Sequence, residues 1–329
     1  MTQEEFEKIW QDDSDFVICH TSGSTGEPKE IKLSKDFMRQ SAVRTNEFFG
    51  IISSCRLHTC LDFEYIASKM MTVRADEAKC VLTSEVPTSK PLGCIGQEET
   101  IDLLSVVPAQ MEWILDNSER WNGIRHILIG GSAIPKMMRR RIALSSFDAW
   151  ETYGMTETAS HIALRKVEEE DVPFVALEGI SVEVDDDGCL VVIMPDGMRL
   201  VTNDIAIVES AKEFRILGRA DNCVISGGIK IMPEDLERKL GPFIAFDYCI
   251  SSVPDKKWGE KLVLAVELSE GTNDEDLIKD AVGVRLKQYR KILDLGVKCP
   301  KDVVCLKELP RTVNGKIDRK RLKSMLSVF

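Results

Sequence analysis

Residues 21–29 read Thr21-Ser22-Gly23-Ser24-Thr25-Gly26-Glu27-Pro28-Lys29, a loop rich in hydroxyl groups and glycine that follows the apolar run Phe16-Val17-Ile18-Cys19. Glycine lets backbone N–H groups approach an anion closely, hydroxyl groups add donors, and Lys29 adds a mobile positive charge. The loop is not a Walker P-loop, because its two glycines are too close together and no Gly-Lys-Ser/Thr follows. It therefore predicts a polyphosphate site behind a buried strand, with a Gly/Ser surface turn as the alternative.

Length and charge favour a two-domain chain without a nucleic-acid partner. The 329 residues can bury a sizeable core, and the net charge of −11 comes from mixed signs without a dominant basic stretch. No apolar run is long enough to span a bilayer, and the acidic start Met1-Thr2-Gln3-Glu4-Glu5 is unlike a signal peptide. We therefore expect no nucleic-acid or membrane partner and a cytoplasmic location.

The cysteines and histidines do not form a recognisable metal pattern. Ten cysteines occur without a C-x-x-C pair, and many lie in apolar runs, where a thiol acts as a small buried hydrophobe. This usage is typical of a reducing compartment. The four histidines are scattered along the chain, so the pattern predicts no zinc site. They are His20, His58, His126 and His161.

The first two hundred residues alternate short apolar runs with helical patterns, which is typical of an α/β domain. Strands are expected at 16–20, 79–82, 103–107 and 127–129. Ser34 is the expected cap of a helix whose apolar positions include Phe37, Val43 and Phe48, and another helix follows Pro135.

From Val182 onward the pattern changes to short strands separated by turns such as Asp185-Asp186-Asp187-Gly188, which predicts a small β-rich subdomain appended to the α/β body. The best domain boundary is Gly218-Arg219-Ala220-Asp221. We therefore expect a large domain over residues 1–220 and a mobile α+β C-terminal domain over residues 221–329. In the latter, the expected strands are 248–253, 262–268 and 303–306, and the expected helix is 274–292.

Three further motifs follow the first loop. They are Tyr153-Gly154-Met155-Thr156-Glu157-Thr158; Asn203-Asp204 with Gly218-Arg219-Ala220-Asp221 and Ser226-Gly227-Gly228; and Pro310-Arg311-Thr312-Val313-Asn314-Gly315-Lys316-Ile317-Asp318-Arg319. In this order the four motifs closely resemble the adenylate-forming superfamily of acyl-CoA synthetases, peptide-synthetase adenylation domains and luciferases, over residues 15–322. The resemblance implies ATP-dependent activation of a carboxylic acid as acyl-AMP with release of pyrophosphate, followed by transfer to the thiol of coenzyme A.

The resemblance assigns nucleotide roles to the first two motifs. The loop would hold the β- and γ-phosphates of ATP through Thr21, Ser22, Gly23, Ser24, Thr25, Gly26 and Lys29. Tyr153 would stack on or beside the adenine, with Gly154 and Gly131 in the same nucleotide site. Thr156 would contact the α-phosphate, and Glu157 would hold Mg²⁺, which prefers carboxylate and phosphate oxygens. The alternatives are a core aromatic for Tyr153 and a solvated carboxylate for Glu157.

The third motif would bind the ribose and connect the two domains. Asp204 suits a ribose diol because a carboxylate accepts two donors, and Arg219 would be its companion at the ribose and phosphate. By the same resemblance Asp221 is the hinge of the small domain. An ordinary linker aspartate is the alternative for Asp221.

The fourth motif carries the catalytic lysine of the resemblance. Lys316 is a mobile point charge that would reach the α-phosphate and the carboxylate as negative charge builds in the transition state of adenylation. After rotation of the small domain, Gly227 and Gly228 would line the pantetheine channel of coenzyme A, since glycine allows a close backbone approach.

The segment between the first two motifs is expected to select the acid. Tyr65 stands where most family members carry a histidine, and Lys69 and Arg74 add two cations on an expected helix. Two cations beside an apolar pocket suit an acid with a second carboxylate, although their spacing does not guarantee a shared face and both could instead face solvent. Further substrate-binding candidates are Ser132, Ser160 and His161, with a core histidine as the alternative for the last. The pattern is most similar to o-succinylbenzoate–CoA ligases of menaquinone biosynthesis.

Two departures from the family pattern affect these assignments. Family members usually have a substantial segment before the phosphate loop, which here begins at Thr21, so we expect either a compact variant or an enzyme that lacks some pocket walls. Glu30 stands where a glycine commonly follows the lysine, which places an anion near the phosphates. Another aryl- or acyl-CoA ligase, an enzyme that loads a carrier protein, and a nucleotide-binding regulatory module stay open as alternatives. The oligomeric state is open as well, a homodimer included.

Overall fold

The structure is a computed structural model that describes residues 1–329 with the exception of 21–28, 97, 269–274, 294, 313–316 and 328–329. The chain folds into two compact units. The first unit comprises Met1–Val182, Ile193–Met198 and Glu209–Arg215. The second comprises Glu183–Val192, Arg199–Val208 and Ile216–Phe329.

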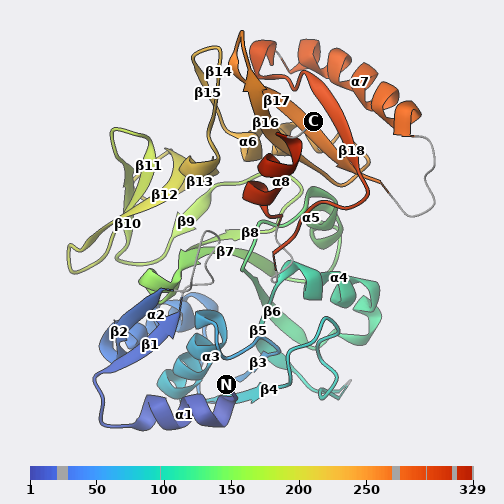
Figure 1. Cartoon of the computed structure of the whole chain (residues 1–329). Coiled ribbons are helices and arrows are strands. Elements are labelled where there is room, and N and C mark those ends of the chain that lie inside the picture. The colour runs from blue at the N-terminus through green and yellow to red at the C-terminus, as the bar shows by residue number, and fades with distance from the viewer. Residues whose placement is uncertain (21–28, 97, 269–274, 294, 313–316, 328–329) are drawn as a thin grey trace. The chain divides into compact units, whose positions relative to one another are not determined.

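A largely parallel sheet forms the centre of the first unit (Figure 1). Its parallel strands lie in the order β4-β3-β5-β6-β7, namely β4 (Val81–Ser84), β3 (Arg56–Thr59), β5 (Ile101–Val106), β6 (Ile124–Ile129) and β7 (Ala149–Met155). β8 (Ser160–Lys166) and β9 (Phe174–Ala176) continue the sheet in antiparallel pairing. β5 consists mostly of buried apolar residues, as expected of a parallel strand that is covered on both faces.

Helices lie on both sides of this sheet. They are α2 (Lys35–Phe49), α3 (Ile66–Ala78), α4 (Pro108–Asp116) and α5 (Lys136–Ala143). Figure 1 shows β5 and β6 between the pair α2 and α3 and the pair α4 and α5. Each pair has its own cluster of buried apolar side chains, with Met38 and Met70 in one and Met111 and Ile127 in the other. This alternation of strands and helices confirms the predicted α/β class. A short 3₁₀ turn, η1 (Ser118–Arg120), follows α4.

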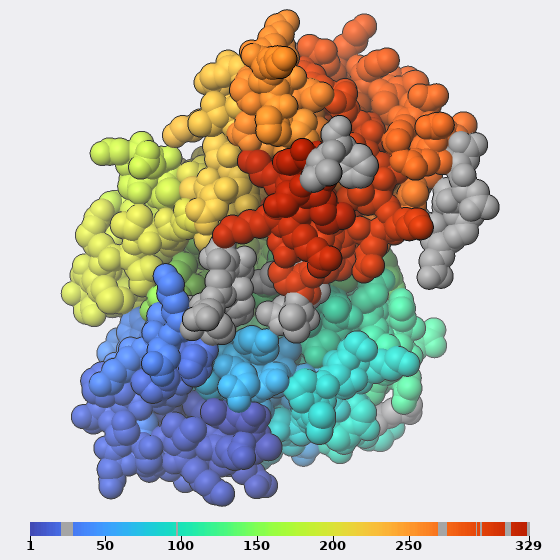
Figure 2. Space-filling model, viewed as in Figure 1, coloured from blue at the N-terminus to red at the C-terminus, as the bar shows by residue number. Residues whose placement is uncertain are grey.

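The N-terminal segment adds a helix that the sequence analysis did not predict. α1 (Gln3–Gln11) begins with a capping box, in which the Thr2 hydroxyl accepts from Glu5 N and the Glu5 carboxylate accepts from Thr2 N. It buries Phe6 and Trp10, and in the space-filling view it forms part of the surface of the first unit (dark blue in Figure 2). β1 (Phe16–His20) has the predicted bounds and pairs with β2 (Glu30–Ser34) in antiparallel orientation.

Helix α2 begins where predicted, but its buried face differs from the prediction. The Ser34 hydroxyl caps it by accepting from Phe37 N at 3.1 Å. The predicted apolar positions Val43 and Phe48 are exposed at 38% and 44%, so that part of the prediction was wrong. The helix instead buries residues that include two hydroxyl side chains, namely Met38, Ser41, Ala42, Thr45, Asn46 and Phe49.

Four consecutive strands follow in the β-rich segment. β10 (Ser181–Val184), β11 (Cys189–Ile193), β12 (Arg199–Val208) and β13 (Glu213–Arg219) are neighbours in this order. The predicted turn between β10 and β11 is present, because the Asp185 carboxylate accepts from Asp187 N and Cys189 N while Gly188 has a φ of +84°.

The remainder of the second unit is the predicted α+β structure. Its sheet has the order β15-β14-β17-β16, with β18 parallel to β17. These strands are β14 (Val224–Ser226), β15 (Ile229–Ile231), β16 (Tyr248–Asp255), β17 (Gly259–Glu267) and β18 (Asp302–Leu306). The helices are α6 (Pro233–Leu240), α7 (Glu275–Ile292) and α8 (Arg319–Leu326), and the 3₁₀ turns are η3 (Ala220–Asn222) and η4 (Gly296–Lys298). Among the described residues, no helix combines the length and the apolar character needed to cross a membrane.

Candidate active site

The second motif folds as a tight turn between β7 and β8. Its tip is a 3₁₀ turn, η2 (Thr156–Thr158), and the strand register shifts between Tyr153 and Gly154. A Cβ atom on Gly154 would lie 2.2 Å from the carbonyl oxygen of Ser160, so only glycine fits there. This requirement comes from the approach of β8 to β7.

Side-chain hydrogen bonds hold this turn in a strained conformation. The Thr158 hydroxyl accepts from Met155 N at 3.0 Å and donates to Ser160 O at 2.7 Å. Ala159 and Ser160 have φ values of +50° and +84°, a region that side chains other than glycine rarely adopt. These hydrogen bonds hold the turn, with Thr156 buried and Glu157 half-buried at its tip.

The predicted phosphate loop leads into a strand that lies beside this turn. Residues Thr21 to Gly26 lie outside the described residues, and Lys29 is exposed. β2 begins immediately afterwards at Glu30 and packs against η2. The strand that follows the first motif thus lies beside the second motif within the first unit.

Tyr153 lies in an aromatic cluster. Its ring centroid is 5.8 Å from that of Phe174 and 5.2 Å from that of Phe214, and the Arg165 guanidinium lies 4.3 Å above Phe174. The ring is half-buried. These neighbours fix its orientation by edge-to-face packing.

Gly131 and Ser132 follow the carboxyl end of β6. Ile129 lies opposite Glu151 in the parallel pair β6–β7, so Gly131 and Tyr153 lie at the same carboxyl edge of the sheet, where α/β proteins bind ligands. Gly131 has a φ of +85°, and Ser132 is exposed.

Three predicted substrate-binding residues meet in the interior of the first unit. Arg74 of α3 is 1% exposed, and its Nη2 lies 3.4 Å from both Ser160 Oγ and His161 Nδ1. His161 Nε2 lies 3.0 Å from the Thr45 hydroxyl, which itself donates to Ser41 O. This pattern assigns the proton of the imidazole to Nε2, so that Nδ1 accepts from Arg74. The alternative in which Arg74 faces solvent is therefore wrong.

Burial dominates the electrostatics of this group. It lowers the pKa of Arg74 to about 9. It also holds the pKa of His161 well below its usual range, and the positive charge of Arg74 acts in the same direction.

Lys69 and Tyr65 lie apart from this cluster. Lys69 is 1% exposed, so it does not face solvent either, but its Nζ donates to Glu64 O at 3.3 Å and lies 6.0 Å from the ring of Phe6. Tyr65 occupies the N-cap position of α3 and is 40% exposed. Lys69 and Arg74 therefore extend towards different neighbours.

The second unit brings the third motif together. Arg219 Nη1 lies 3.4 Å from Asp204 Oδ1, and Arg219 Nη2 lies 3.5 Å from Asp221 Oδ2, the predicted hinge residue. All three side chains are at least partly exposed to solvent.

Gly227 and Gly228 form the two-residue turn between β14 and β15. Their φ values of +58° and +79° are those of a primed hairpin turn. A Cβ atom on Gly227 would lie 2.7 Å from Cε3 of Trp258, whereas nothing lies within 4 Å of the same position on Gly228.

Lys316 of the fourth motif lies outside the described residues. On either side of it, Arg311 and Ile317 form an antiparallel bridge.

Sequence reasoning missed Thr45 and Ser41 of α2. The Ser41 hydroxyl donates to Ala159 O at 2.9 Å, and Thr45 orients His161. A signal was present in the sequence, because hydroxyl residues four apart lie on one face of a helix. It was missed because the buried face was sought among apolar residues.

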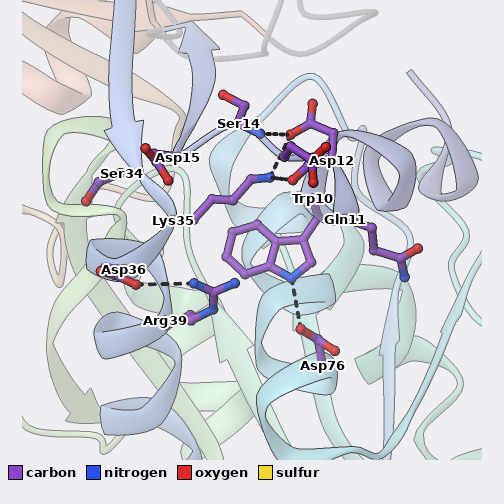
Figure 3. Close-up of a pocket in the computed structure, with 11 residues that line it drawn as sticks. Trp10, Gln11, Asp12, Ser14, Asp15, Ser34, Lys35, Asp36, Arg39 and Asp76 are labelled. Carbon is purple, nitrogen blue, oxygen red and sulfur yellow. Dashed lines mark hydrogen bonds and ion pairs between the residues drawn. The ribbon is translucent and has the colours of Figure 1, made fainter.

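A cavity of about 430 Å³ lies elsewhere in the first unit, between α1 and α2. In Figure 3 the Lys35 side chain points to Asp12, with Nζ 2.7 Å from Oδ1, and the Trp10 indole donates to Asp76 at 3.0 Å. The Arg39 guanidinium lies 5.1 Å from the Trp10 ring. None of the predicted site residues lines this cavity, whose contacts fasten α1 to α2 and α3.

Comparison with known proteins shows the family of this chain. The AMP-binding enzyme family model matches residues 2–195, and the model of the AMP-binding enzyme C-terminal domain matches residues 241–316. The chain therefore belongs to the AMP-binding enzyme family.

Particular relatives within the family are acid–CoA ligases. The indoleacetate–CoA ligase of Aromatoleum aromaticum is 27% identical over 354 residues, covering 95% of this chain and 67% of the relative. The 2-succinylbenzoate–CoA ligase of Bacillus subtilis is 27% identical, covering 97% of this chain and 71% of the relative. A solved structure of O-succinylbenzoate coenzyme A synthetase from Bacillus subtilis, in complex with ATP and magnesium ion, has a TM-score of 0.79 at 22% identity and covers 93% of this chain and 69% of that one.

These findings confirm the resemblance drawn from the four motifs. They also confirm the predicted class of enzyme, an AMP-forming acid–thiol ligase that depends on ATP.

Proposed function

We propose that this chain activates an acid with a second carboxylate, o-succinylbenzoate being the best candidate, and transfers it to coenzyme A. The single observation that carries the proposal is that Arg74 is a buried cation without an anionic partner among the described residues. Its guanidinium is buried, and no carboxylate pairs with it among the residues that the structure describes. Nη1 donates to the sulfur of Met71, Nη2 meets Ser160 and a neutral His161, and Nε has no partner there.

A buried cation without an anion is unfavourable, because the charge loses its hydration and gains no partner in return. A substrate carboxylate supplies that partner, and Arg is suited to hold it through a planar pair of hydrogen bonds. The ligase relatives that act on 2-succinylbenzoate support the same acid class.

The reaction proceeds in two steps. The thiol of coenzyme A accepts the acyl group in the second step. In the first step the reacting carboxylate attacks the α-phosphorus of ATP, the bond to pyrophosphate breaks, and acyl-AMP forms. In the second step the thiol attacks the acyl carbon, AMP leaves, and the thiol proton is released.

The residues of this chain act by binding and orientation. Tyr153 and Gly131 hold the adenine side of the nucleotide, Asp204 and Arg219 bind the ribose, and the loop from Thr21 to Lys29 holds the terminal phosphates. Thr156 orients the α-phosphate from the turn between β7 and β8. Lys316 neutralises the charge that builds during adenylation. Gly228, which has open space beside it, lies along the path of the pantetheine arm together with Gly227.

A magnesium ion fits the second motif. Glu157 is a half-buried carboxylate at the tip of the rigid turn, and carboxylate oxygen is a preferred ligand of Mg²⁺. Glu157 would hold the ion, which supplies charge neutralisation for the phosphates when bound.

Pyrophosphate release across a panel of acids tests the proposal. With ATP and Mg²⁺, o-succinylbenzoate is expected to give release, and thioester is expected only when coenzyme A is added. If indoleacetate gives release and o-succinylbenzoate does not, the chain acts on an aryl monoacid and the dicarboxylate assignment fails. ATP binding without release for any acid would instead indicate a regulatory module.

The variant Arg74→Gln tests the role of the buried guanidinium. A hydrogen bond to a charged group contributes about 1.5–3 kcal/mol, so kcat/KM for o-succinylbenzoate is expected to fall about 10- to 150-fold. Indoleacetate, if accepted at all, should be affected much less. The matched control is Arg125→Gln on β6, an exposed arginine that should leave both acids unchanged. An equal loss for both acids in Arg74→Gln would contradict recognition of the second carboxylate.

A further inference from the structure

Three potential metal ligands from separate parts of the sequence meet beside β3 and β4. They are His58 of β3, Glu85 directly after β4, and Cys94 in the following segment. One ligand atom from each residue lies within 4.8 Å of the others. The cluster contains no residue of the proposed catalytic or substrate site.

Strand pairing explains why these residues meet. β3 and β4 are parallel, and His58 lies opposite Thr83 in their register. Glu85 follows Thr83 by two residues, so the extended chain directs both side chains to the same side as the imidazole. The imidazole is fully buried, whereas Cys94 is exposed, so the cluster runs from the interior to the surface.

The hydrogen bonds of His58 leave one ring nitrogen facing a carboxylate. Nδ1 lies 2.8 Å from the Thr83 hydroxyl, and that hydroxyl donates to Leu57 O at 3.3 Å. In the tautomer in which Nδ1–H donates to Thr83, the lone pair is on Nε2. In the other tautomer Thr83 donates to Nδ1 instead, and Nε2–H donates to Glu85. Nε2 lies 3.4 Å from Glu85 Oε1, so in the first tautomer a cation fits between these two atoms.

A cation held by Nε2 and the Glu85 carboxylate would select the first tautomer. Histidine ligands of metals commonly donate their other N–H to an outer partner that fixes the ring, and Thr83 occupies that place here. Ligands of tetrahedral zinc lie about 3.3–3.8 Å apart, given metal–ligand bonds of about 2.0–2.3 Å. The separation of 3.4 Å between Nε2 and Oε1 agrees with this spacing.

The carboxylate and the thiol are positioned by the segment between β4 and β5. Glu85 accepts from Leu92 N through Oε1 and from Gly93 N through Oε2 at 3.0 Å, which fixes its orientation. Cys94 N donates to Glu85 Oε2 at 3.4 Å, and the Cys94 Sγ lies within 4.8 Å of a carboxylate oxygen of Glu85. This segment, residues 85–100, has no helix or strand among its described residues and lies at the surface of the first unit (cyan in Figure 2).

We propose that His58, Glu85 and Cys94 form a zinc site, with water in the fourth position. Imidazole nitrogen, thiolate and carboxylate are the three ligand types that zinc takes. Binding requires loss of the thiol proton. The site would fasten the irregular segment 85–100 to β3, and it is separate from the magnesium that serves the phosphates.

Metal analysis of the full-length protein tests this site. Purified protein, freed of metal by a chelator and reloaded with zinc in excess Mg²⁺, is expected to retain about one zinc ion per chain. Replacement by cobalt(II) should give the visible bands of tetrahedral coordination together with a thiolate charge-transfer band. The melting temperature of the reloaded protein should rise with zinc concentration.

Matched variants locate the ion. Cys94→Ser changes an exposed residue, and it should abolish stoichiometric zinc and the thiolate band while the protein stays folded. Thr83→Val removes only the outer partner and should weaken zinc affinity about 10- to 100-fold. The control Cys80→Ser, a cysteine outside the cluster, should bind zinc like the parent protein.

Two results would overturn the proposal. In the first, the parent protein binds no more zinc per chain than Cys94→Ser does, and the three residues then form a contact without a metal. The other is zinc bound equally by the parent protein, Cys94→Ser and His58→Gln, which would place the ion elsewhere. Neither result depends on the acid that the enzyme activates.

Discussion

The imidazole of His161 is held between a hydroxyl group and a guanidinium in the interior of the first unit. Burial, assisted by the charge of Arg74, keeps its pKa well below the usual range, so the folded protein keeps this ring neutral in mild acid. The unfolded chain takes up a proton near the ordinary histidine pKa of about 6.5. Because the unfolded state then binds more protons, stability is full above this pH and falls as the pH drops below it.

We therefore predict that His161→Gln makes stability less sensitive to acid. Between pH 6 and pH 5 the free energy of unfolding of the parent protein should fall more steeply than that of the variant, by up to about 1.4 kcal/mol per pH unit. Urea unfolding at a series of pH values measures both slopes. His20→Gln, which changes an exposed histidine, is the control and should keep the parent slope. Identical slopes for the parent protein and His161→Gln would contradict the neutral buried ring.

At the scale of elements, the turn between β7 and β8 is set by backbone contact. Ala placed at Gly154 would bring Cβ within 2.2 Å of a backbone oxygen that the Thr158 hydroxyl also binds. We expect Gly154→Ala to lower the free energy of unfolding by at least about 1–3 kcal/mol, the usual effect of overpacking, and to lower ligase activity as the tip of the turn shifts.

Gly283→Ala is the matched control for this substitution. Gly283 lies within α7, and nothing lies within 4 Å of its Cβ position. Ala in the middle of a helix should therefore stabilise the protein by about 0.5–1 kcal/mol. Urea midpoints measure both changes. If Gly154→Ala were as stable as the parent protein, the turn would be adaptable.

The sequence predicted elements well where pattern and caps agreed, and less well where polar residues are buried. β1 and the start of α2 were predicted correctly, because an apolar run and a serine cap are local signals. The buried face of α2 was not, since Ser41 and Thr45 face inward to bind Ala159 O and His161. Their partners lie more than a hundred residues away, and no local pattern reports them.

At the scale of the whole chain, motif order predicted the family but not the neighbours of each side chain. Arg74 was named from its charge, yet only the fold shows that it meets Ser160 and His161 while Lys69 extends to α1. The scattered histidines argued against a zinc site, and nothing in the sequence indicated that His58 meets Glu85 and Cys94. Strand pairing removes that objection, because parallel neighbours bring distant residues to one edge of a sheet.

The two half-reactions give the last prediction, which concerns division of labour along the chain. Lys316 is proposed to act only while negative charge builds at the α-phosphate, and loss of such a charge-stabilising donor typically lowers the rate about 10²- to 10³-fold. Lys316→Ala should therefore abolish most acyl-adenylate formation, measured as pyrophosphate exchange, while thiolysis of supplied acyl-adenylate continues near the parent rate. Lys320→Ala, an exposed lysine at the start of α8, should leave both steps unchanged. An equal loss of both steps in Lys316→Ala would mean that this lysine serves the structure of the C-terminal segment or both reactions, and the proposed division would fail.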